Sequence, residues 1–258
     1  MPPRMAGRAA LVTGGGGGIG EATGRLFAEE GAAVALVDTN HVAVEAAAAS
    51  IARDVKGARV IALVADLTRE AECDRVVGET LAELHGLHTL VNVAGVRLYT
   101  ALAEADSEGW EFILGVNVLA TAYSSKAALP ALRKSGRGTI VNLSSVYGVK
   151  GRTGMGQYDT TKAAVLGFTR ALAMEEAPHG IRVNAVCPGG TITPYHIRRA
   201  AAQGVSEAEM RTQRTHDNLL GRWAEPREVA YPILFLASDE SSYVTGATLM
   251  VDAGKSIM

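Results

Sequence analysis

The stretch that decides the fold runs from Ala9 to Asp38 and reads AALVTGGGGGIGEATGRLFAEEGAAVALVD. It opens with the apolar run Ala9–Thr13, which is typical of a buried parallel strand. Glycines follow, then a helical pattern continues to Gly31, and a second apolar run ends at Asp38. In this order of elements, glycines let the main chain approach a pyrophosphate and the helix N-terminus presents free amides. The stretch therefore predicts a dinucleotide-binding unit rather than a flexible linker.

Asp38 occupies the position expected of a residue that selects the cofactor. It ends the second strand, about 20 residues after Gly18. A carboxylate there can accept hydrogen bonds from both ribose hydroxyls of NAD, and it would repel the 2′-phosphate of NADP. The alternative is a solvated residue at the end of a strand. The prediction is NAD rather than NADP.

Apolar runs and helical segments alternate along the rest of the chain. The expected strands cover 58–67, 88–95, 138–145, 181–190 and 248–254. The expected helices cover 40–53, 71–84 with Thr68 as N-cap, a long segment from Asp106 or Ser107 through Leu132, 158–177 and 226–237. Repeated strand–helix–strand units predict the α/β class, with one doubly wound, Rossmann-like parallel sheet and helices on both faces. Ligands of such sheets bind at the carboxyl ends of the strands.

The chain shows no internal linker or repeat, so residues 1–258 are expected to form a single domain. The segment from about 193 to 222 breaks the alternation, because it is polar, weakly helical and interrupted at Gly204. Long inserted segments beside a cleft are often lids. We therefore expect a lid-like insertion there.

Tyr158 and Lys162 lie four positions apart in a helical segment, so their side chains share one face of the helix. A nearby cation favours the phenolate and lowers the pKa of a phenol toward working pH. Tyr158 would then be a usable proton donor and acceptor. The alternative is an ordinary amphipathic helix. Ser145 precedes the pair at the end of an expected strand.

Composition excludes several classes of protein. The formal net charge of −2 and the absence of a basic tract argue against nucleic acid as a partner. Cys73 and Cys187 lie far apart, and the histidines show no metal-binding spacing, so neither a disulfide framework nor a metal site is expected. The N-terminus has no apolar stretch of signal-peptide length, and no apolar run approaches the roughly 20 residues of a membrane span. We expect a cytoplasmic protein with reduced cysteines and no membrane partner.

Taken together, these features resemble the classical short-chain dehydrogenase/reductase family over essentially the whole chain. The matching motifs are the glycine turn Thr13-Gly14-x-x-x-Gly18-Ile19-Gly20, the pair Asp66-Leu67, the segment Asn92-Val93-Ala94-Gly95, the tetrad Asn117, Ser145, Tyr158 and Lys162, the loop containing Pro188, Gly189, Thr191 and Thr193, and the C-terminal SDESSYVTGATLMVDAG. Relatives that prefer NADP usually carry an arginine or lysine in the glycine turn or after the second strand. This chain has Gly15 to Gly17 and Thr39-Asn40 at those places.

The resemblance implies a role for each residue of the tetrad. Tyr158 would exchange a proton with the substrate oxygen while a hydride passes to or from the nicotinamide, and Ser145 would hydrogen-bond the same oxygen. Lys162 would lower the pKa of Tyr158 and hold the nicotinamide ribose, and Asn117 would anchor a water that relays the proton. The implied activity is NAD-dependent interconversion of a secondary alcohol and a ketone on a small molecule, either a hydroxy acid, a sugar or polyol, or a cyclic alcohol. The remaining motif residues, Gly14, Gly18, Ile19, Gly20, Asp38, Asp66, Leu67, Asn92, Ala94, Gly95, Pro188, Gly189, Thr191 and Thr193, would contact the cofactor.

The chain departs from the family pattern at a few positions. Val93 stands where a second asparagine is usual, Met155 where a glutamine is frequent, and Thr191 where isoleucine or valine is usual. Ala253 replaces the first glycine of the usual terminal pair. None of these changes removes a catalytic group.

By the same resemblance, the substrate contacts would come from Ser145, Tyr147, Met155, Tyr158, Gly190, Tyr195 and His196, with Arg97, Tyr99 and Val146 nearby. The expected lid adds Arg198, Arg199, Arg211, Arg214 and His216. Such cations suit a carboxylate-bearing substrate, and the alternative is a solvated surface paired with Glu207 and Glu209.

Two alternatives within the fold remain open, a 3-oxoacyl-thioester reductase and a non-catalytic NAD(H)-binding sensor. Reduction of the thioester usually goes with NADPH, which Asp38 disfavours. A sensor typically lacks the tyrosine or the lysine that this chain keeps. A flavin or methyl-donor Rossmann protein would share the glycine turn without needing Tyr158, Lys162 or Ser145. The family also implies a homotetramer.

Overall fold

A computed structural model of the protein describes residues 3–212 and 216–258. Within these residues, seven strands form one parallel sheet in the order β3-β2-β1-β4-β5-β6-β7. The strands are β1 (Ala9–Thr13), β2 (Ala33–Asp38), β3 (Arg59–Val64), β4 (Thr89–Asn92), β5 (Thr139–Leu143), β6 (Arg182–Pro188) and β7 (Thr248–Val251). The α/β class and the doubly wound parallel sheet are confirmed.

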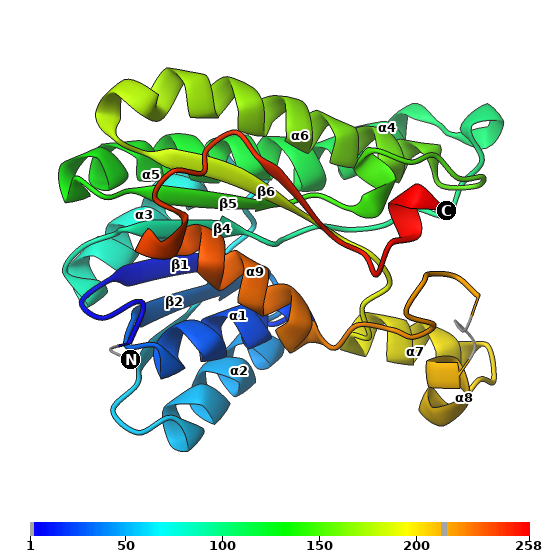
Figure 1. Cartoon of the computed structure of the whole chain (residues 1–258), viewed down its shortest axis with the longest axis horizontal. Helices are drawn as coiled ribbons and strands as arrows, with labels where there is room; N and C mark the ends of the chain where they lie inside the picture. The colour runs from blue at the N-terminus through cyan, green and yellow to red at the C-terminus, as the bar shows by residue number, and fades with distance from the viewer. Residues whose placement is uncertain (1–2, 213–215) are drawn as a thin grey trace.

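Helices cover both faces of the sheet (Figure 1). The helices are α1 (Gly18–Glu29), α2 (His41–Asp54), α3 (Glu70–Leu84), α4 (Ser107–Leu114), α5 (Ala120–Ser135), α6 (Gly156–Glu176), α7 (Pro194–Ala202), α8 (Glu207–Thr212) and α9 (Pro226–Ala237). Helices α1, α2 and α9 bury apolar side chains on one face, and α3, α5 and α6 do so on the other. Short turns of 3₁₀ helix lie at Leu102–Glu104, Val146–Gly148, Ala177–His179, Asp239–Ser241 and Lys255–Ile257.

Strand order reverses between β1 and β4. The chain builds β2 and β3 on one side of β1 and then crosses to place β4 on the other side. A crevice forms outside the carboxyl ends of the strands at such a reversal, because the adjoining connections leave in opposite directions. The glycine turn follows β1, and the segment from Asn92 to Gly95 begins at the last residue of β4, so both predicted motifs meet there.

The start of α3 corrects two predictions. Strand β3 ends at Val64, so Asp66 and Leu67 lie in the connection rather than in the strand. Thr68 is not the N-cap, which is Arg69, because Asp66 Oδ1 accepts hydrogen bonds from both the amide (3.0 Å) and the hydroxyl (2.7 Å) of Thr68. The threonine hydroxyl is therefore committed to a local turn and cannot cap the helix.

The long predicted helix exists and reaches beyond Leu132. It starts after Asp106, whose side chain caps it by accepting from the amide of Gly109, and it continues as α4, a π-helical turn (η2, Gly115–Leu119) and α5. This stretch, Ser107–Ser135, is long and apolar enough to cross a membrane by length and composition alone. The sequence pattern did not single it out because polar residues interrupt its apolar positions. It packs against α3 and α6 within the domain.

The segment between β6 and α9 forms the two short helices α7 and α8, which project from the body of the molecule beside the carboxyl ends of the strands (Figure 1). Side chains of this segment pack into a small apolar cluster in which Ile192, Ala200, Met210 and Trp223 are buried. The predicted lid-like segment therefore has a core of its own. Arg214 lies outside the described residues.

Candidate active site

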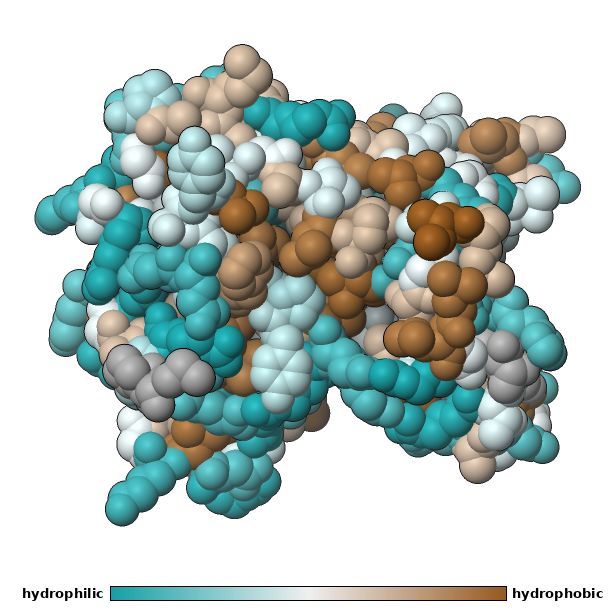
Figure 2. All heavy atoms as spheres, in the orientation of Figure 1, coloured by the Kyte–Doolittle hydropathy of each residue, from teal (hydrophilic) through white to brown (hydrophobic). Residues whose placement is uncertain are grey.

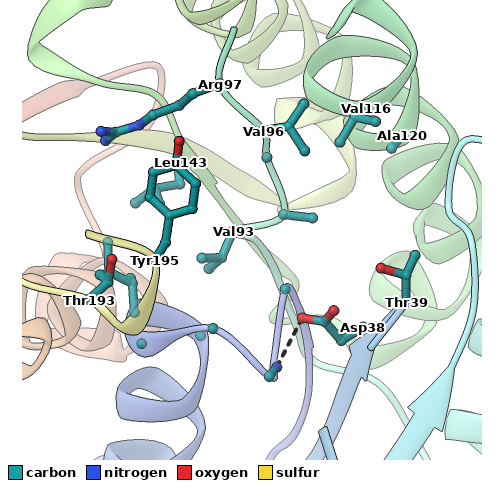
Figure 3. Close-up of a pocket in the computed structure, with 18 of the residues that line it drawn as sticks. Asp38, Thr39, Val93, Val96, Arg97, Val116, Ala120, Leu143, Thr193 and Tyr195 are labelled. Carbon is teal, nitrogen blue, oxygen red and sulfur yellow. Dashed lines mark hydrogen bonds between the residues drawn. The ribbon is translucent and has the colours of Figure 1, made fainter. Parts of the chain in front are cut away.

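A cavity of about 930 Å³ opens at the carboxyl ends of the strands. Figure 3 shows part of its lining, with Asp38 and Thr39 on one side and Arg97 and Tyr195 on the other. Most of the predicted cofactor residues line it: Gly14, Gly18, Ile19, Gly20, Asp38, Asp66, Leu67, Ala94, Gly95, Tyr158, Lys162, Pro188, Gly189, Thr191 and Thr193. Asn92 and Asn117 are not among the lining residues and lie buried behind it.

The glycine turn has room for main chain only. Gly14 has φ +67°, a conformation that favours glycine, and a Cβ there would lie 2.9 Å from the amide nitrogen of Ala94. A Cβ on Gly20 would lie 2.1 Å from the carbonyl oxygen of Gly14. Thr13 Oγ1 accepts hydrogen bonds from the amides of Val93 (3.0 Å) and Ala94 (3.1 Å), which fixes the turn against the end of β4. Helix α1 therefore starts with its N-terminus at the cavity, where a pyrophosphate would fit.

Asp38 braces this turn. Its Oδ2 accepts from the amide of Gly16 (3.1 Å, dashed in Figure 3), and its Oδ1 accepts from the amide of Asn40 (3.0 Å). Each carboxylate oxygen keeps further acceptor capacity toward the cavity.

Tyr158, Lys162 and Ser145 come together at the other half of the sheet. Lys162 lies one turn after Tyr158 on α6, and its Nζ is 5.8 Å from the centroid of the Tyr158 ring and donates to the carbonyl of Leu143 (2.8 Å). Burial alone would raise the pKa of the Tyr158 phenol, but the charges of Lys162 and Arg97 and a hydrogen bond with Ser145 leave that pKa below its ordinary value. Burial lowers the pKa of Lys162, because it disfavours the charged ammonium. The pKa values of Tyr158 and Lys162 are therefore both shifted downward, as suits a phenol that exchanges protons beside a cation.

The two serines after β5 point to different partners. Ser144 Oγ donates to the main-chain carbonyl of Lys162 (2.7 Å). Ser145 Oγ accepts from the amide of Tyr147 (3.2 Å), and of the two serines it is the one whose hydroxyl lowers the pKa of the Tyr158 phenol. Ser145 is therefore the serine next to the phenol.

Asn117 lies in the π-helical turn and clamps the wall of the site. Its Oδ1 accepts from the amide of Val96 (2.8 Å), and its Nδ2 donates to the Val96 carbonyl (3.0 Å) and to Thr161 Oγ1 (2.9 Å). The side chain thus joins the connection after β4 to α6. A Cβ on Gly95 would lie 3.2 Å from both Asn117 Oδ1 and Lys162 Nζ. A π-helical turn of this kind is frequent at functional sites.

Comparison with known proteins bears on this arrangement. Residues 14–256 match a family model described as enoyl-(acyl carrier protein) reductase. The chain is 36% identical to the 2,5-dichloro-2,5-cyclohexadiene-1,4-diol dehydrogenase of Sphingobium indicum over 100% of this chain and 99% of that protein. It is 38% identical to the cyclopentanol dehydrogenase of Comamonas testosteroni (97% and 98% covered), and 35% identical to 2-(S)-hydroxypropyl-CoM dehydrogenase 3 of Xanthobacter autotrophicus (98% and 98%). The chain belongs to the short-chain dehydrogenase/reductase family. It is an oxidoreductase that acts on CH–OH groups and interconverts a secondary alcohol and a ketone.

The predicted substrate residues of this short-chain dehydrogenase/reductase fall into two sets. Ser145, Tyr158, Tyr195 and His196 line the cavity, and Tyr147, Met155 and Gly190 are not among its lining residues. Met155 packs with Ile113 and Tyr158 in a buried apolar cluster that Tyr147 also contacts. The main-chain carbonyl of Gly190 accepts from the amide of Ala224.

Arg152 is a cation near the site that the sequence did not indicate. Its guanidinium carbon lies 3.6 Å from the ring centroid of Tyr147 and 5.3 Å from that of Tyr158. Asp159, on the first turn of α6, pairs with it at 3.1 Å. Arg152 lies in a loop with neither a helical spacing to Tyr158 nor a known motif, so no sequence signal marks it.

The arginines of the lid-like segment lie in different surroundings. Arg198 lines the cavity. Arg199 stacks on Tyr99, with its guanidinium carbon 3.7 Å from the ring centroid. Arg211 is exposed and pairs with Glu207 (2.7 Å), as the solvated-surface alternative predicted, and with Glu225 (2.5 Å). Glu209, the other partner that this alternative named, accepts from the amide and hydroxyl of Ser206. His216 is exposed.

Proposed function

We propose that this short-chain dehydrogenase/reductase uses NAD to oxidise a secondary alcohol of a small molecule, with Tyr158 as the acid–base group. The observation that carries the proposal is the buried phenol of Tyr158, which lines the cavity beside Ser145 and Lys162 and whose lowered pKa prepares it to take a proton there. The relatives that act on a cyclohexadiene diol and on cyclopentanol support a small alcohol as substrate.

The residues around the cavity fit a nicotinamide dinucleotide. A Cβ on Gly14 or Gly20 would clash with main-chain atoms of Ala94 or Gly14, so these glycines permit the tight turn that brings the N-terminus of α1 to a pyrophosphate. Near β6, Thr191 lines the cavity, and its buried Oγ1 has no hydrogen-bond partner in the described residues. Together with Thr193 it can hold the carboxamide. When bound, the cofactor supplies the hydride acceptor.

The protein's own groups perform the proton chemistry. Ser145 and Tyr158 hold the substrate oxygen, and the phenolate of Tyr158 takes the hydroxyl proton. Lys162 stabilises that phenolate through its charge. We further propose that a water associated with Asn117 returns the proton to solvent. Buried surroundings strengthen each of these interactions, because little water screens them.

The choice of NAD rests on the charges near Asp38. The lining residues at this end of the cavity include Asp38 and Asp66, whereas the lining cations Arg97, Lys162 and Arg198 come from the connection after β4, from α6 and from α7. A 2′-phosphate beside Asp38 would meet a carboxylate and no lining cation in the described residues. This arrangement also disfavours an NADPH-linked thioester reductase.

We propose that the protein is a cytoplasmic homotetramer without a membrane partner. Exposed apolar side chains are consistent with further burial on assembly: Met174 on α6 is 81% exposed and Ile257 at the C-terminus is also 81% exposed. Figure 2 shows apolar side chains gathered over the face that carries β7 and the C-terminal turn. Light scattering coupled to size-exclusion chromatography tests the assembly, and a monomer would overturn it.

The activity itself is tested by following NADH formation from NAD with secondary alcohols. Wild-type protein should turn over some of them, and Tyr158→Phe should still bind NADH but lose turnover. NADH binding without turnover of any alcohol would favour the sensor alternative.

A further inference from the structure

Arg97 is a cavity-lining cation that helps Lys162 to lower the pKa of Tyr158 and that also has donors facing the cavity. It follows β4, and its guanidinium carbon lies 5.4 Å from the ring centroid of Tyr158 and 6.0 Å from that of Tyr195. Figure 3 shows Arg97 and Tyr195 together on the side of the cavity away from Asp38. The guanidinium therefore borders the space in which the substrate oxygen must sit.

The partners of Arg97 hold it in place without neutralising it. Its Nη1 donates to Nε2 of His196 (2.6 Å), and Nδ1 of that histidine lies 2.9 Å from Thr193 Oγ1. The tautomer with its proton on Nδ1 satisfies both contacts. The other interactions of Arg97 are with the phenols of Tyr158 and Tyr99. Within residues 3–212 and 216–258, no carboxylate forms an ion pair with Arg97.

Two neighbouring cations, Arg152 and Lys255, differ from Arg97 because each has a carboxylate partner. Arg152 is paired with Asp159, and Lys255, behind Tyr147, is paired with Asp217. A partly buried guanidinium that is oriented by a histidine and lacks a carboxylate has N–H donors to offer to a ligand. A planar guanidinium matches the geometry of a carboxylate or sulfonate better than an ammonium does.

We propose that Arg97 binds an anionic oxygen group of the substrate, so that the substrate is a small hydroxy acid whose carboxylate or sulfonate lies close to the carbinol carbon. This inference rests on the proposed function, because Tyr158 and Ser145 hold the carbinol oxygen. His196 acts as a positioning residue that fixes the guanidinium. Arg198, which also lines the cavity, adds a second positive charge at its mouth.

The test compares charged alcohols with neutral counterparts of nearly the same shape. The pairs are lactate with lactamide and 3-hydroxybutyrate with 3-hydroxybutyramide, and 2-hydroxypropanesulfonate separates sulfonate from carboxylate. Wild-type enzyme should favour the anionic member in kcat/KM. Loss of the Arg97 charge raises the pKa of Tyr158 for every substrate, so rates are compared at a pH above the acid limb set by Tyr158. There Arg97→Met should weaken kcat/KM for the anions roughly 10- to 100-fold, mainly through KM, and change kcat/KM for the amides much less. Arg97→Lys should restore part of the loss.

Arg199→Met is the matched control, because Arg199 stacks on Tyr99 at the surface and does not line the cavity. It should leave both members of each pair unchanged. Equal kcat/KM for acids and amides in wild type would overturn the inference while leaving the proposed function intact. So would an Arg97→Met variant that loses kcat/KM equally on acids and amides at a pH above the Tyr158 limb, since Arg97 would then act only through the pKa of Tyr158.

A binding measurement decides the matter without turnover. Calorimetry with the enzyme–NADH complex would use butyrate, propanesulfonate and butyramide as unreactive probes. Binding of the anions that falls in Arg97→Met, with NADH binding retained, supports the anion site even if no alcohol is oxidised and the proposed function fails. Absence of anion binding to wild type, or equal binding to the variant, rejects the site.

Discussion

At the scale of single residues, the chemistry of the site depends on how several cations act on one phenol. Tyr158 is buried, which disfavours its phenolate, and Lys162, Arg97 and Arg152 together outweigh that effect. The four-residue spacing of Tyr158 and Lys162 predicts from the sequence that the Lys162 cation lies near the ring. The others come from loops, and only the folded chain brings them to the ring.

Replacing Tyr158 by phenylalanine removes the proposed proton acceptor and keeps the ring that packs with Met155 and Ile113. We expect turnover to fall by at least about 100-fold, which is the lower end of what a general base contributes. NADH binding, measured by fluorescence, should change little. Near-normal turnover would show that another group takes the proton.

The lowered pKa of Tyr158 also fixes the direction of a pH effect. Alcohol oxidation needs the phenolate, so its rate should rise as pH increases through the Tyr158 pKa. Lys162→Met removes the largest charge that lowers this pKa, and the acid limb of the kcat/KM profile should move to higher pH. An unchanged limb in a variant that still binds NADH would mean that Lys162 does not tune the phenol.

Asp38→Asn tests the cofactor choice at a single residue. The amide oxygen can keep one of the hydrogen bonds from Gly16 or Asn40, and the charge is lost. We expect the preference for NAD over NADP, measured as the ratio of kcat/KM values, to fall roughly tenfold or more. The same ratio in wild type and variant would assign cofactor selection to other residues.

At the scale of elements, the turn after β7 connects the end of the sheet to the lid-like segment. Asp252 accepts from the amides of Gly254 (3.0 Å) and Ser256 (2.7 Å), and the carbonyl of Ala253 accepts from the amide of Leu219 (2.9 Å). Ala253, which stands where the family usually has glycine, has φ +54°. The departure seen in the sequence thus places a side chain in a conformation that glycine adopts more readily.

Ala253→Gly should stabilise the protein slightly. Relief of the left-handed conformation contributes about 1–2 kcal/mol, and the larger entropy that glycine loses on folding offsets about 0.5–1 kcal/mol of it. The expected net gain corresponds to an increase in Tm of about 2 °C. Differential scanning calorimetry measures it, with Gly254→Ala as the opposite control, because Gly254 has φ +78° and a Cβ there would lie 2.5 Å from Leu219 Cδ1. A lower Tm for Ala253→Gly would contradict this account.

At the scale of the whole molecule, the alternation of apolar runs and helices was enough to predict the parallel sheet, and the glycine turn was enough to place the cavity. Element ends were less predictable: Thr68 looks like an N-cap until the Asp66 carboxylate takes its hydroxyl. Arg152 was missed because its approach to Tyr158 depends on loop geometry. Spacing alone could not show that Met155 packs behind the phenol instead of lining the cavity.

The claim that this protein oxidises alcohols with NAD is tested by the initial rate of NADH formation. The purified protein is given NAD with hydroxy acids, sugars, polyols and cyclic alcohols, and NADP serves as the comparison. We predict turnover of at least one secondary alcohol, faster with NAD than with NADP, and strongest for substrates that carry an anionic group. Tight NADH binding with no turnover of any alcohol, by a protein that keeps Tyr158, Lys162 and Ser145, would contradict the claim.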